Sequence, residues 1–167
     1  MFRIVEFQHV KPGKGAAFVR TKLKNVETGA VVDKTFRAGE KVEEVVLEHH
    51  RMQYLYRDDE SYVLMDLEDY EQIIAAPGVI GEASSYLVEN QELSVFMRDG
   101  KPITIELPAA VPLKVAKADR WLKGDTTGAS TKPVTLETGL VIQVPLFVEE
   151  GDLLKVDTRS GRYIERA

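Results

Sequence analysis

Hydrophobic and polar positions alternate over many short runs of this chain, which is the pattern of β-strands. Over residues 16–23, for example, Val19 and Leu23 share one face and charged side chains occupy the other. We therefore expect strands over residues 2–7, 16–23, 30–36, 45–56, 61–66, 93–97, 103–107, 113–118, 140–144, 153–156 and 163–166.

Two segments in the middle of the chain do not alternate in this way. Residues 67–74 and 82–90 are compatible with short helices, and Pro77 and Gly78 are expected to break them. The fold class that follows is all-β with a minor helical part.

The spacing of strands and turns divides the chain into three β-units. We place the boundaries at residues 1–43, 44–107 and 108–167, with Pro108 and Pro112 marking the last one. About five short strands in each of the last two units are typical of small OB-type barrels.

Composition excludes several classes of protein. The 167 residues contain no Cys and three His, which excludes disulfides and thiolate nucleophiles and makes a His-ligated metal centre unexpected. No apolar run reaches the roughly 18 residues of a membrane span, and no signal peptide is recognisable. We expect a cytoplasmic monomer without cofactor, metal or catalytic residues.

Charge is distributed unevenly along the chain. Residues 1–43 carry nine Lys/Arg and five Asp/Glu, residues 44–107 carry four and fourteen, and residues 108–167 carry nine and eight. The first unit is therefore basic although the whole chain has a net charge of −5. Its densest part has no acidic residue and contains Lys11, Lys14, Arg20, Lys22 and Lys24.

A lysine flanked by glycines occupies the predicted turn between the first two strands. Pro12 stiffens the approach, and Gly13 and Gly15 add no side-chain bulk, so Lys14 is expected to project as one long ammonium group. The segment lacks the Gly-x-x-x-x-Gly-Lys-Ser/Thr pattern of a nucleotide-binding loop. An ordinary solvent-exposed turn lysine remains the alternative.

Several segments resemble the bacterial translation elongation factor P family. Residues 10–18 resemble the hairpin of its first domain, residues 123–128 resemble its Gly-Asp-Thr loop, and residues 155–161 resemble its closing strand and turn. The family's C-terminal signature is matched at Lys132, Val134, Gly139, Ile142, Val144, Pro145, Val148 and Gly151. The resemblance extends over essentially the whole chain.

The resemblance implies an SH3-like, KOW-type first domain, two OB-fold domains and an L shape similar to tRNA. It implies a factor that binds the 70S ribosome beside peptidyl-tRNA and relieves stalling at consecutive prolines. Lys14 would approach the peptidyl-transferase centre and could be extended by a lysine-modifying enzyme. The alternative is a paralogue, or a general OB protein that binds single-stranded RNA.

The resemblance also implies roles for other residues. Lys11, Arg20, Lys22 and Lys24 would contact phosphates of tRNA or rRNA. Gly124, Asp125 and Thr126 would lie at the exit-site codon of the mRNA. Near the C-terminus, Tyr163 and Arg166 are candidate RNA contacts, with strand packing and solvation as their alternatives.

The chain departs from the family pattern at its start. Family members begin with a further hairpin-sized segment before the strand at residues 2–7, and this segment is missing here. We therefore expect exposed strand edges in the first barrel, and a higher melting temperature when the segment is restored.

Overall fold

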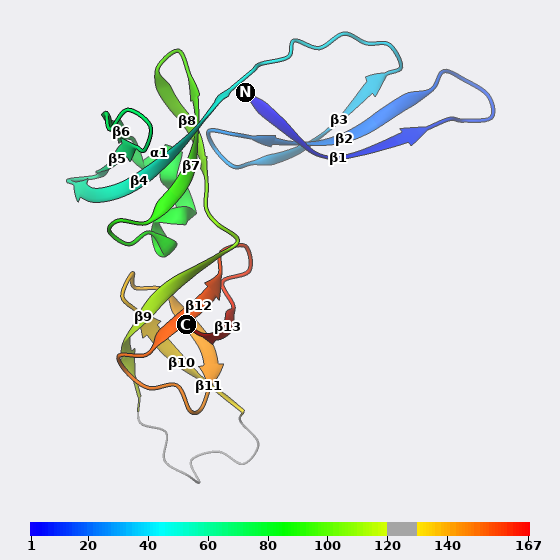
Figure 1. The fold of residues 1–167 in the computed structure, drawn as a ribbon. Helices are drawn as coiled ribbons and strands as arrows, with labels where there is room; N and C mark the ends of the chain where they lie inside the picture. The colour runs from blue at the N-terminus through cyan, green and yellow to red at the C-terminus, as the bar shows by residue number, and fades with distance from the viewer. Residues whose placement is uncertain (120–129) are drawn as a thin grey trace. The chain divides into compact units, whose positions relative to one another are not determined.

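The computed structural model describes residues 1–119 and 130–167, which form three β-sheets with a short helical segment (Figure 1). The chain divides into two compact units. Residues 1–49 and 95–104 make the first, and residues 50–94 and 105–167 make the second. The all-β class is confirmed, and each sheet lies within one of the three predicted sequence ranges.

The first sheet has the strand order β1-β2-β3. Its strands are β1 (Phe2–Val10), β2 (Phe18–Asn25) and β3 (Val31–Arg37). Among the sheet's residues only Thr21 and Leu23 are buried, and every position of β1 before Val10 is exposed. The sheet thus has almost no hydrophobic core of its own.

The central sheet has the strand order β6-β5-β4-β7-β8. Its strands are β4 (Glu48–Asp58), β5 (Ser61–Asp66), β6 (Gln72–Ala75), β7 (Glu92–Arg98) and β8 (Lys101–Glu106). Asp99 and Gly100 join β7 and β8 in a tight hairpin: both residues have positive φ, 51° and 73°, as a two-residue type I′ turn requires.

The predicted helix over residues 67–74 is wrong, and the other is displaced. Residues 72–75 form β6, with Ile73 and Ala75 turned inward and Ile74 exposed. Helical structure instead begins at Pro77, in α1 (Pro77–Ile80) followed by the 3-10 helix η1 (Gly81–Tyr86). Proline is tolerated at the first position of a helix because its missing N–H would have no partner there.

The third sheet has the strand order β11-β10-β9-β12-β13. Its strands are β9 (Ala110–Ala118), β10 (Thr131–Leu136), β11 (Val141–Pro145), β12 (Leu153–Asp157) and β13 (Tyr163–Arg166). They enclose a core of Val111, Leu113, Val115, Val134, Leu136, Ile142, Val144, Val148, Leu154 and Val156.

Pro112 lies inside β9 and does not mark a boundary. The first half of β9 pairs only with β12, and the second half pairs only with β10. Proline is accepted there because one side of the strand has no neighbour that needs its N–H.

Within the second unit, the chain around the end of η1 contacts the third sheet. Tyr86 and Val88 pack against the core of the third sheet, and the Thr138 hydroxyl donates a hydrogen bond to the Ser85 carbonyl at 2.6 Å. These contacts hold the end of η1 against the third sheet.

Candidate nucleic-acid interface

The predicted tip loop joins β1 and β2 at the far end of their hairpin (Figure 1). The last strand pair is Val10 with Phe18, and the residues from 11 to 16 are all exposed. Among the described residues, Lys14 has no hydrogen-bond or ion-pair partner. Its amine is therefore available to a ligand.

The two glycines of the loop are not equivalent. Gly15 has a φ of +122°, a conformation that a residue with a Cβ rarely adopts. Gly13 has no positive φ and open space around the position of a Cβ. Of these two positions, the structure requires glycine only at Gly15.

Alanine substitutions should separate the two positions. Gly15→Ala is expected to destabilise the protein by about 1–3 kcal/mol because alanine is strained at this φ. Gly13→Ala should leave stability unchanged or slightly raised, since it only restricts the unfolded chain. Urea unfolding followed by circular dichroism measures both, and equal effects of the two substitutions would contradict this loop geometry.

Basic side chains follow one face of β2. Arg20, Lys22 and Lys24 alternate with the buried positions of the strand and are exposed. The strand register adds Arg3, which is paired with Lys24, and Arg37, which is paired with Phe18, to the same face. These two arginines could not be placed on the basic face from the sequence, because their positions depend on pairing between strands.

Two carboxylates reduce the charge of this basic face. Lys22 Nζ lies 3.1 Å from Glu6 Oε2, and this hydrogen bond, with the charges of Glu6 and Asp33, raises the pKa of Lys22. Arg20 and Lys24 make no ion pair among the described residues. They are therefore better placed than Lys22 to bind a phosphate.

Only two of the predicted RNA contacts in residues 108–167 fall on residues that the structure describes. Gly124, Asp125 and Thr126 lie outside the described residues. Tyr163 packs against the core of the sheet. Arg166 Nη2 donates a hydrogen bond to the Phe147 carbonyl at 2.8 Å and lies 3.1 Å from Asp152 Oδ2. The Arg166 guanidinium also stacks on the Phe147 ring. RNA contact by Tyr163 and Arg166 stays a prediction.

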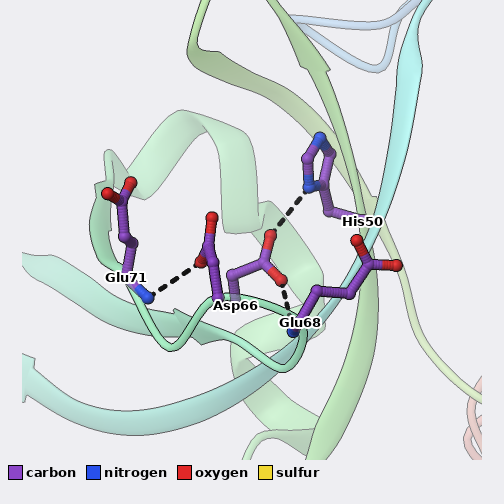
Figure 2. Close-up of polar contacts among 5 residues, drawn as sticks. His50, Asp66, Glu68 and Glu71 are labelled. Carbon is purple, nitrogen blue, oxygen red and sulfur yellow. Dashed lines mark hydrogen bonds and ion pairs between the residues drawn. The ribbon is translucent and has the colours of Figure 1, made fainter.

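A buried carboxylate organises the turn between β5 and β6 (Figure 2). Asp66 is 5% exposed, lies 2.7 Å from His50 Nδ1 and accepts a hydrogen bond from the Glu68 N–H at 2.8 Å. The Glu68 N–H, followed by His50 and the Asp69 N–H, lowers the pKa of Asp66, although burial acts to raise it. The sequence alone did not identify Asp66 as the partner of His50.

The described residues contain no group of three His, Cys, Asp or Glu side chains that could hold a metal ion. No helix among them has the length and apolar character needed to cross a membrane.

Three family models match successive parts of the chain. The Elongation factor P (EF-P) KOW-like domain matches residues 1–42, the Elongation factor P (EF-P) OB domain matches residues 47–105, and Elongation factor P, C-terminal, matches residues 111–166.

Curated relatives named Elongation factor P match over almost the full chain. The protein of Paenarthrobacter aurescens is 51% identical over 99% of this chain and 89% of the relative. The protein of Moorella thermoacetica is 53% identical over 100% of this chain and 90% of the relative. The protein of Maridesulfovibrio salexigens is 54% identical over 99% of this chain and 89% of the relative.

A solved structure also matches in part. The eukaryotic translation initiation factor 5A from Methanococcus jannaschii is 21% identical, with a TM-score of 0.49 over 64% of this chain and 77% of that chain. The family assignment does not depend on this likeness.

Proposed function

Because this chain belongs to the elongation factor P family, we propose that it binds the ribosome beside peptidyl-tRNA. There it would promote peptide-bond formation where consecutive prolines stall the ribosome. The observation that carries this proposal is the exposed Lys14, which is free of partners among the described residues and is presented by a loop at the end of a hairpin.

The contribution of the factor is positional. Proline reacts poorly in a constrained geometry, and holding two reacting ends close to their attack geometry lowers the barrier. An ammonium group beside the phosphates of the tRNA acceptor end adds electrostatic stabilisation where water is partly excluded. On this account the reaction belongs to the ribosome, and the chain is a translation factor and not an enzyme.

The basic face of β2 would hold the factor against tRNA or rRNA. Arg20 and Lys24, assisted by Lys11, offer exposed charges that bind phosphates without reading sequence. Such contacts release counterions from RNA, so binding should weaken as salt rises.

The remaining partners follow from the family. Gly124, Asp125 and Thr126 would contact the mRNA codon in the exit site, and a lysine-modifying enzyme would extend the Lys14 side chain. Because its proposed partner is the ribosome, the factor would act in the cytoplasm. Mass spectrometry of the peptide that contains Lys14, taken from the native host, tests the modification.

Ribosome binding tests the basic face. The variant Arg20→Gln/Lys24→Gln should bind ribosomes about 10-fold more weakly, because two exposed phosphate contacts are lost, and its binding should depend less on salt. Glu27→Gln, an exposed change in the β2–β3 turn, is the control and should bind like the wild type. Co-sedimentation at several salt concentrations measures this, and equal binding of both variants would contradict the assignment.

The alternative is a general protein for single-stranded RNA. Such a protein would bind unstructured RNA as tightly as ribosomes. A fluorescence binding assay with a short single-stranded RNA, run beside ribosome binding, distinguishes the two functions.

A further inference from the structure

A small polar pocket of about 220 Å³ lies within the second unit, beside η1. Its polar side chains come from β4, β5, η1 and the β10–β11 turn: Tyr54, Arg57, Tyr62, Ser84, Ser85 and Thr138. Leu87 adds an apolar patch. The pocket is smaller than the roughly 300–1,000 Å³ of sites for drug-sized molecules but has room for several waters of about 30 Å³ each, so it suits a small ligand.

A β-bulge in β4 brings three of these side chains to one face. The register with β5 shifts after Tyr54 and leaves Leu55 as the extra residue. In a regular strand, side chains three positions apart, such as Tyr54 and Arg57, point to opposite faces. Here Tyr54 pairs with Leu64. Arg57 pairs with Tyr62, which lies two positions before Leu64 in β5, so the three pocket side chains share a face.

Two tyrosine hydroxyl groups of the pocket lack a hydrogen-bond partner. Tyr54 is 8% exposed and Tyr62 is 7% exposed, and their ring centres lie 5.9 Å apart. Neither hydroxyl bonds to any residue that the structure describes, and neither is sealed from solvent. Tyrosine hydroxyls that are largely buried usually have a partner. Both groups are therefore open to a ligand in the pocket.

Arg57 is the cationic group of the pocket. Its guanidinium carbon lies 5.4 Å from the centre of the Tyr62 ring, and its Nε donates a hydrogen bond to the Asp59 carbonyl at 2.8 Å. The two terminal nitrogens make no hydrogen bond or ion pair within the described part of the chain. Over the same residues, no carboxylate lines the pocket. The pocket therefore offers a positive charge and hydroxyl donors.

The charge of Glu89 acts on this pocket from outside it. Burial raises the pKa of Tyr54, and the charges of Tyr62 and Glu89 raise it further, whereas Arg57 lowers it. Tyr54 thus keeps its proton at neutral pH and can donate a hydrogen bond. Glu89 is exposed and does not line the pocket, but it would repel an anion there while Arg57 attracts one.

We propose that this pocket binds a phosphate group, either as free inorganic phosphate or as a phosphate carried by RNA. A tetrahedral oxyanion accepts hydrogen bonds from several directions, which fits one guanidinium and hydroxyl donors from different elements. Ser84 and Ser85 can turn their hydroxyl groups toward it. A nucleobase would need an open ring face for stacking, and the rings of Tyr54 and Tyr62 are buried.

Titration of the full chain with inorganic phosphate, at constant ionic strength, tests the pocket. Calorimetry should show one-site binding that saturates below about 10 mM. Arg57→Gln should weaken it about 10-fold or more, and Tyr54→Phe about 5-fold, since each removes a donor to a charged ligand. Arg98→Gln, the same charge change in β7, and Tyr56→Phe, at an exposed position of β4, are controls and should bind like the wild type.

Two further measurements distinguish an anion site from a structural role. Glu89→Gln should tighten phosphate binding about 2-fold because a repulsive charge is removed. Weaker binding of this variant would show that the pocket prefers a neutral or cationic ligand. Tyr54→Phe should keep its melting temperature without phosphate, since the hydroxyl has no protein partner to lose. A marked drop would show that the hydroxyl serves the fold, and either result would overturn the proposal.

Competition distinguishes the two sources of phosphate. If RNA carries the phosphate, a short single-stranded RNA should displace inorganic phosphate and bind more tightly, and Arg57→Gln should weaken both. If the ligand is free phosphate, RNA should not displace it. Both results support the pocket. The absence of saturable binding by either ligand, or equal binding by the wild type and Arg57→Gln, would overturn it.

This test is independent of the proposed function. The pocket lies in the second unit and Lys14 lies in the first. The phosphate titration needs no ribosome, whereas relief of stalling is measured through Lys14. A failure of one account therefore leaves the other to be decided by its own experiment.

Discussion

Replacing Lys14 by alanine is expected to remove the ability of the protein to relieve stalling at consecutive prolines. The amine is exposed and has no partner among the described residues, so its loss should not disturb the fold. A hydrogen bond to a charged group contributes about 1.5–3 kcal/mol, which corresponds to a loss of rate of about 10- to 100-fold. The measurement is the rate of full-length product from a message that encodes three consecutive prolines.

Two controls make the Lys14 result specific. Lys11→Ala removes a charge from the same loop and should reduce activity much less, because it removes a phosphate contact and not the group at the tip. A message without consecutive prolines should show no difference between the variants. Activity of Lys14→Ala equal to that of the wild type would exclude the tip-lysine mechanism.

Replacing Asp66 by alanine is expected to lower the free energy of unfolding more than the substitutions at Gly13, Gly15 or Asp58. Asp66 is almost fully buried, and its carboxylate holds both His50 and the N–H of Glu68. Removing one member of a buried charged network costs about 3–5 kcal/mol, because the partners lose their hydrogen bonds. Asp58→Ala, at the exposed end of β4, is the control and should change stability by less than about 0.5 kcal/mol.

Acidification should reproduce part of this loss. The folded-state pKa of Asp66 is lowered, so its contribution is complete above the unfolded-state value of about 4 and is lost as pH falls through the folded value. Urea unfolding of the wild type and of Asp66→Asn should therefore show a stability gap at pH 7 that narrows below about pH 4. A gap of the same size at both pH values would show that ionised Asp66 is not the stabilising species.

Strand positions could be predicted because alternation of side chains is a local property. The predicted strand at residues 163–166 coincides with β13, and the Asp99-Gly100 hairpin needed only the preference of these residues for positive φ. The short strand β6 was missed because its adjacent Ile73 and Ile74 interrupt the alternation of apolar and polar residues. Its Ile73-Ile74 pair fits a helix face equally well until pairing with β5 fixes the orientation.

Side-chain partners could not be predicted because they depend on the register between strands. His50 and Asp66 are sixteen positions apart and meet only when β4 and β5 pair. Arg3 and Arg37 join the basic face for the same reason. Lys14 could be predicted because its exposure depends on a local turn, and the special backbone conformation at Gly15, but not at Gly13, required coordinates.

The proposed function is tested by measuring the rate of peptide-bond formation on ribosomes stalled at consecutive prolines, with and without the added protein. The wild type should accelerate this step on the proline message and leave the rate on a message without consecutive prolines unchanged. No acceleration on the proline message, or equal acceleration on both messages, would contradict it.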